Sequence, residues 1–146
     1  METALHVAAG ANQLEFVEML INDEDIDLTY QDIHGNTAFC SAVIPGAIRI
    51  VQKFLTLPNL SDYFIKTRGS QNMSPLFIAS WFGQLEVTSL LYQHTNAVDI
   101  EAGEKFGVYF NCIKNDMFEL AIKMIEDNAA IDIAHQYDTN KETALH

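Results

Sequence analysis

One short phrase recurs along this chain at nearly constant spacing. Its copies begin at residues 3, 37, 74, 107 and 143, so successive copies start 34, 37, 33 and 36 residues apart. The first and last copies both read Thr-Ala-Leu-His, whereas the fourth, which begins at Gly107, is degenerate. A period of about 20 to 50 residues is typical of stacked units, because a single unit of this size cannot bury its own apolar face.

Each phrase is followed by a second segment with helical periodicity. These segments cover residues 14–21, 48–55, 85–92 and 118–125, and their apolar residues recur three and four positions apart. That spacing predicts a helix with one buried face. Every unit should therefore contain two short antiparallel helices, and the fold class should be all-α, a solenoid of stacked helix-turn-helix units.

Local signals mark the ends of these helices. Thr3, Thr37 and Ser74 open the first three phrases, and their hydroxyl oxygens can cap a helix N-terminus. Pro75 would lie in the first helical turn, where its missing N–H costs nothing. A glycine lies in or near the expected turn between the two helices of the first three units: Gly10, Gly46 and Gly83.

Turn-rich segments at residues 30–36, 68–72 and 101–104 separate the units and predict hairpin-shaped fingers. We expect a single array over residues 1–146, truncated at both ends, because neither end resembles the polar cap that usually closes a solenoid. The predicted units are about 3–36, 37–73, 74–106 and 107–142, with a fifth starting at 143.

The charge of the chain excludes some classes of partner. The formal net charge is −12, and 49% of the residues are hydrophobic. A negative field repels phosphate backbones and anionic membrane surfaces, so we expect no nucleic-acid partner. No apolar stretch reaches the roughly 18 residues that span a bilayer, so we expect no membrane span in this chain.

No residue pattern indicates catalysis, and we expect neither a cofactor nor a metal. Cys40 and Cys112 lie in separate apolar segments, without a base nearby in the repeat pattern. The histidines at 34, 94 and 135 are scattered over separate loops and lack metal-ligand spacing. The acidic run 23–27 resembles a calcium loop, but Leu28 replaces the required glycine, so we interpret the run as a solvated loop.

The phrase at 3–9, its following helix and the Asp-x-x-Gly finger at 32–35 resemble ankyrin repeats, and the resemblance extends over essentially the whole chain. Residues 2–11, 35–40 and 73–79 are more narrowly similar to plant ankyrin-repeat proteins with a C-terminal PGG membrane domain, which this sequence lacks. That resemblance implies a cytoplasmic module in signalling or stress response, whose full-length relatives are tethered to membranes. It also implies that His6 and His146 bond to the backbone of an adjacent finger.

The ankyrin resemblance implies a non-catalytic scaffold that binds a protein through its concave face. The negative net charge favours a basic surface on that partner. Family-variable positions of the concave face correspond here to His34, Asn36, Ser41, Ile44, Gln71, Met73, Ile78, Trp81, Phe82, Glu104, Phe106, Asn111 and Lys114. Trp81 and Phe82 are either exposed anchors for the partner or packed against a neighbouring unit.

Two further hypotheses follow from the ends of the array. The chain could be a soluble fragment of a membrane-tethered ankyrin signalling protein with no independent function. The uncapped ends could also self-associate, because we expect apolar residues there to be partly uncovered: Leu5, Val17 and Leu20 at one end, Ile122 and Ile125 at the other.

Overall fold

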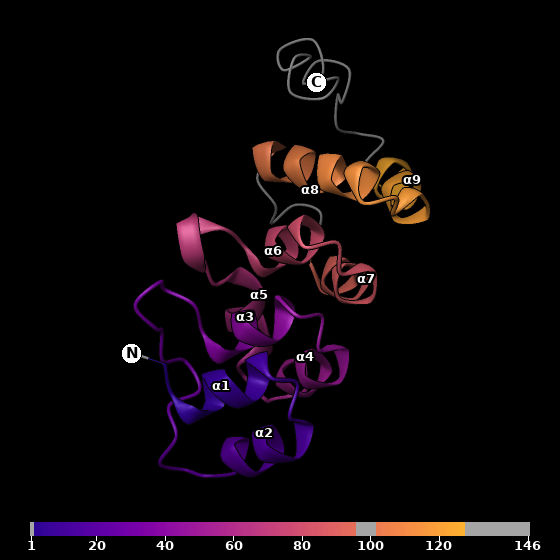
Figure 1. Ribbon diagram of the computed structural model, residues 1–146. Helices are drawn as coiled ribbons and strands as arrows, with labels where there is room; N and C mark the ends of the chain where they lie inside the picture. The colour runs from indigo at the N-terminus through magenta and orange to yellow at the C-terminus, as the bar shows by residue number, and fades with distance from the viewer. Residues whose placement is uncertain (1, 96–101, 128–146) are drawn as a thin grey trace.

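The computed structural model describes residues 2–95 and 102–127, which form an all-helical stack of helix pairs (Figure 1). The first helices of successive units are α1 (Ala4–Gly10), α3 (Ala38–Val43), α6 (Pro75–Trp81) and α8 (Ala102–Lys114). The second helices are α2 (Leu14–Ile21), α4 (Ile48–Leu55), α7 (Leu85–His94) and α9 (Phe118–Asp127). The prediction of an all-α solenoid with two helices per unit is confirmed.

The first helices begin where the sequence predicts them in three units. The side-chain oxygens of Thr3, Thr37 and Ser74 accept hydrogen bonds from the backbone N–H three residues later, at 3.4, 3.4 and 3.1 Å. Pro75 follows Ser74 at the start of α6, as expected. Each cap satisfies one of the backbone N–H groups that a helix N-terminus leaves unpaired.

The turn inside each unit repeats with the same geometry. A residue with left-handed backbone occupies the turn at Asn12, Gly46, Gly83 and Asp116, and these positions are 34, 37 and 33 residues apart. The next residue donates its backbone N–H to the carbonyl oxygen five positions earlier, at 2.7 to 3.0 Å. This is the Schellman arrangement, which favours glycine. The repeat period is thus built into the backbone, even where the sequence of the fourth unit is degenerate.

The fourth unit departs from the prediction at its start. Residues 102–104 were expected in a finger, but they form the first turn of α8, so this helix begins five residues before Gly107. Gly107 lies inside the helix, where a Cβ atom would stand 2.7 Å from Cε2 of Phe77 on α6. The absent side chain lets α8 pack closely against that ring.

A short helix that the repeat pattern does not predict lies between the second and third units. This helix, α5 (Ser61–Lys66), packs against α4 and α6 and buries Phe64 completely. The Phe64 ring centroid lies 5.2 Å from that of Phe39 and 5.1 Å from that of Phe54. Three fully buried aromatic rings therefore join α3, α4 and α5.

The expectation of partly uncovered apolar residues holds for Ile122 and Ile125 at one end of the stack. At the other end it holds for Leu20 but is wrong for Leu5 and Val17. Leu5 and Val17 are fully buried, because they face α3 and α4 of the second unit, and Leu20 is half-buried. Instead, Phe16 and Met19 of α2 are exposed there. At the other end, Ile122 and Ile125 are exposed as predicted. No helix within the described ranges has the length and apolar character to cross a membrane.

Candidate partner-binding groove

Two hairpin-like fingers project from the same side of the stack, opposite α4 and α7 (Figure 1). In the first, the Asp32 N–H donates to the Asn36 carbonyl oxygen at 2.9 Å. In the second, the Gly69 N–H donates to the Met73 carbonyl oxygen at 2.9 Å, around a 3₁₀ turn at Ser70–Asn72. The predicted fingers at 30–36 and 68–72 are therefore present, closed by equivalent hydrogen bonds.

Hydrogen bonds tie each finger to its neighbours. His6 Nε2 lies 2.9 Å from the carbonyl oxygen of Asn36, and the Asn36 Oδ1 atom accepts a bond from the Ser70 N–H at 2.8 Å. His6 Nδ1 lies 2.8 Å from the Thr3 hydroxyl oxygen. The imidazole is buried and uses both nitrogens, so His6 has the structural role that the resemblance implied. His146 lies outside the described residues.

Partial burial and hydrogen bonding have opposite effects on the pKa of Asp32. Desolvation disfavours its carboxylate, but the backbone N–H groups of Asn36 and His34 donate to it, at 2.9 and 2.8 Å. Together with the charges of His6 and His34, these bonds hold the pKa of Asp32 below its ordinary value of 3.8. The ionised carboxylate thus fixes the turn of the first finger.

A groove of about 650 Å³ lies between the fingers and the first helices α3 and α6. Its polar wall comes from the two fingers, and its apolar wall comes from the end of α3 and from α6. The lining residues are His34, Asn36, Ile44, Ser70, Gln71, Met73, Phe77, Ile78, Trp81 and Phe82. A concave, mostly apolar site with a few polar groups is the usual form of a binding site.

Eight of the predicted site residues line this groove: His34, Asn36, Ile44, Gln71, Met73, Ile78, Trp81 and Phe82. Trp81 and Phe82 are 53% and 50% exposed, which favours the anchor interpretation over packing. Ile78, at 2% exposure, forms the floor of the groove. Ser70 and Phe77 were missed, although each lies next in sequence to a predicted residue.

The other predicted site residues lie outside this groove. Asn111 is 2% exposed, because its amide donates a hydrogen bond to Ser80 Oγ at 3.1 Å in the contact between α8 and α6. Contrary to the prediction, Asn111 is therefore buried between α8 and α6 and does not lie on the binding surface. Ser41 and Phe106 are half-buried. Lys114 is exposed, and its Nζ lies 5.4 Å from the centroid of the Trp81 ring, within reach of a cation–π contact.

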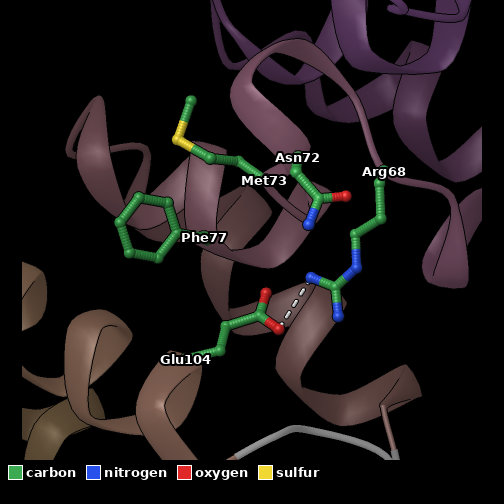
Figure 2. Close-up of a pocket in the computed structure, with 5 residues that line it drawn as sticks. All are labelled: Arg68, Asn72, Met73, Phe77 and Glu104. Atoms are coloured by element: carbon green, nitrogen blue, oxygen red, sulfur yellow. Dashed lines mark hydrogen bonds and ion pairs between the residues drawn. The ribbon is translucent and has the colours of Figure 1, made fainter.

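Glu104 lines a smaller pocket of about 250 Å³, which shares Met73 and Phe77 with the groove (Figure 2). The Arg68 guanidinium donates to a Glu104 carboxylate oxygen at 2.8 Å, and the Ser74 hydroxyl donates to the other oxygen. Glu104 therefore links α8 to the second finger and to the cap of α6. Both of its oxygens are therefore hydrogen-bonded within the chain.

The remaining reactive groups offer no catalytic arrangement within the described residues. Burial raises the pKa of the Cys112 thiol to about 11, and burial likewise raises that of Cys40. A buried, protonated thiol is a poor nucleophile. In residues 2–95 and 102–127, no three His, Cys, Asp or Glu side chains gather closely enough to hold a metal. His135 lies outside these ranges.

The sequence family is decided by one comparison. The family model of ankyrin repeats matches residues 5–104 in three copies. This chain belongs to the ankyrin-repeat family. Ankyrin repeats are protein-interaction modules, and the matched range holds all ten residues that line the groove. The degenerate fourth unit of the ankyrin array, apart from the start of α8, lies beyond the match.

No curated protein matches this ankyrin-repeat chain. Among solved structures, it is similar to a chain in the complex of the Bd0816 predatory endopeptidase from Bdellovibrio bacteriovorus with immunity protein Bd3460. The identity is 25%, the TM-score is 0.70, and the similarity covers 88% of this chain and 65% of the other. The ankyrin-repeat chain thus spans less than two thirds of that neighbour.

Proposed function

We propose that this ankyrin-repeat chain is a non-catalytic scaffold that binds a segment of a partner protein in the groove between its fingers and α6. The exposure of Trp81 and Phe82 on the groove wall is the observation that carries the proposal. Large aromatic side chains are costly to leave in water and are enriched among the residues that dominate interface energies. The similar solved structure is itself a complex of two proteins, which supports a binding role.

The groove has the features that a polypeptide ligand needs. Its apolar wall can bury side chains of the partner, and its finger wall offers side-chain groups of Asn36, Ser70 and Gln71 for hydrogen bonds to a peptide backbone. The first finger is held to α1 by the contact of His6 with the Asn36 carbonyl, and to the second finger by the bond from the Ser70 N–H to the Asn36 side chain. A preorganised wall of this kind lowers the ordering cost of binding.

A selection for peptide ligands tests this function. Random twelve-residue peptides displayed on phage would be selected on the immobilised chain, and the winners would be fluorescein-labelled for anisotropy titrations. We expect Trp81→Ala/Phe82→Ala to weaken binding at least tenfold, because both anchors are removed. Phe16→Ala/Met19→Ala is the matched control, since it removes two exposed apolar side chains from α2, and it should change affinity less than twofold.

The stability of the two variants must be compared as well. Because both Trp81 and Phe82 are half exposed, their joint replacement should leave the urea midpoint close to that of the control variant. If the groove variant unfolds, the two rings belong to the core. If it stays folded and binds every selected peptide as tightly as the wild type, the groove is not the binding site.

We also propose that the module acts in cytoplasmic signalling or stress response, as part of a longer protein tethered to a membrane. The resemblance of residues 2–11, 35–40 and 73–79 to plant ankyrin proteins of the PGG type supports this setting. The coding sequence downstream of His146 tests it. Apolar segments of about 20 residues are expected there, and a stop codon directly after His146 in full-length transcripts would contradict the proposal.

A further inference from the structure

The acidic residues of this chain are distributed unevenly over the fold. The first helices α1, α3 and α6 contain no Asp, Glu, Lys or Arg. Most carboxylates of the described residues lie instead on the second helices, on the loops that follow or precede them, and on α5. These residues are Glu15, Glu18, Asp23, Glu24, Asp25, Asp27, Asp62, Glu86, Asp116, Glu119, Glu126 and Asp127. The net charge therefore does not describe the surface that faces the groove.

The groove itself carries no carboxylate. Its ten lining residues include no Asp, Glu, Lys or Arg, and His34 is the single titratable residue among them. Asp32 lies nearby, but its Oδ1 accepts two backbone hydrogen bonds of the finger. A cationic partner residue would leave water here without a carboxylate to receive it, which is unfavourable. The groove thus does not favour the basic partner that the net charge suggested.

A cation stands at the edge of the groove. Lys114, at the end of α8, places its ammonium 5.4 Å from the centroid of the Trp81 ring. Neither of the ion pairs in the described ranges, Lys53 with Glu18 and Arg68 with Glu104, involves Lys114. Its ammonium is exposed and oriented by the aromatic ring, so it can receive an anionic group from a ligand that packs on Trp81.

We propose that the groove takes a partner segment whose apolar side chains pack on Trp81 and Phe82 and whose carboxylate pairs with Lys114. This inference rests on the proposed function of the groove and specifies the ligand. The rest of the segment is apolar, because the groove lining contains no Asp, Glu, Lys or Arg. The carboxylate is an Asp or Glu side chain or a chain terminus, placed where the segment passes from α6 toward α8.

The labelled peptides selected on the wild-type chain test this specificity. Peptides that depend on Trp81 and Phe82 should combine apolar residues with at least one acidic residue. Lys114→Glu should weaken them about three- to tenfold, because an exposed ion pair is replaced by a repulsion. Changing the acidic residue of the peptide to Lys should restore binding to Lys114→Glu. Lys123→Glu, the same charge change at an exposed position of α9, should alter affinity less than twofold.

The outcomes separate the two proposals. If the peptides depend on Trp81 and Phe82 but carry basic or neutral flanks and ignore Lys114→Glu, the carboxylate inference is wrong and the groove function stands. An equal loss with Lys114→Glu and Lys123→Glu means that total charge alone is responsible, and this too overturns the inference. If no peptide depends on Trp81 and Phe82, both proposals fall together.

Discussion

The carbonyl oxygen of Asn36 lies 2.9 Å from the Nε2 atom of His6, although 30 residues separate them in the chain. The first helix of one unit is thereby bonded to the finger that precedes the next. Asn36 passes the connection onward, since its side-chain oxygen accepts the Ser70 N–H of the following finger. The polar wall of the groove is thus a row of fingers joined through one asparagine.

Replacing Asn36 with alanine should loosen the second finger. The substitution removes the acceptor of the Ser70 N–H and leaves the backbone bond to His6 intact, so we expect a loss of about 1 kcal/mol in the free energy of unfolding. Urea denaturation measures it. Gln71→Ala is the control in the same groove wall, because Gln71 is exposed, and its effect should stay within about 0.5 kcal/mol. Equal effects of the two changes would show that the Asn36 bond contributes nothing.

Two glycines of α8 should respond differently to alanine. Nothing lies within 4 Å of a Cβ built on Gly103, so Gly103→Ala should stabilise the chain by up to about 1 kcal/mol through helix propensity. A Cβ on Gly107 would meet Phe77 Cε2 at 2.7 Å, so Gly107→Ala should be less stable than Gly103→Ala by about 1 kcal/mol or more. Thermal melting of both variants tests this, and a Gly107→Ala variant that gains as much stability would show that α8 does not pack there.

The first finger should weaken in acid. Because the pKa of Asp32 is lowered in the folded chain, its ionised form stabilises the fold above the ordinary value of 3.8, and this contribution is lost as the pH falls through the lowered value. Asp32→Asn keeps an acceptor oxygen but cannot titrate. We expect its urea midpoint to fall less than that of the wild type between about pH 4 and pH 2. If the urea midpoints of the wild type and of Asp32→Asn changed equally with pH, the stabilising role of the Asp32 carboxylate would be contradicted.

The two cysteines should resist thiol reagents in the native state. Burial raises the pKa of Cys112 to about 11 and also raises that of Cys40, so neither forms much thiolate at pH 8. Labelling with a maleimide should be slow without denaturant and complete in urea. Mass spectrometry after a short pulse distinguishes the two sites, and rapid native labelling of Cys112 would show that α8 opens readily.

The sequence predicts the fold well wherever the same position of each unit has the same structural role. Thr3, Thr37 and Ser74 cap helices in every instance, so their spacing is enough to place the first three units. The sequence does not predict α5, because a single helix of six residues has too few positions to show a period. The burial of Phe64 in the structure explains why this helix forms. The prediction also fails at the start of α8, where Gly103 was expected in a finger and Gly107 at the start of the helix, although both lie inside it.

The candidate site is predicted in outline but not in its details. Positions on the fingers and α6 reach the groove because every unit places them there. Sequence alone could not separate Asn111 from Lys114, since both lie on α8 and are polar. Asn111 is buried because Ser80 on α6 provides a partner for its amide, while Lys114 extends along Trp81 to water. Whether a polar side chain of α8 is buried or exposed therefore depends on which side chain of the neighbouring unit lies opposite it.

The main helix contacts in the described chain join elements of one unit or of adjacent units, such as α1 with α3, α3 with α6 and α6 with α8. Opening of the α8–α9 pair would therefore leave α1 to α4 packed as before. A ligand held by both Trp81 and Lys114 would bridge α6 and α8 and slow that opening. The affinity of the ligand would then include the free energy of keeping α8 and α9 packed on α6. Occupancy could therefore be followed by the hydrogen exchange of α9, a helix that the ligand does not touch.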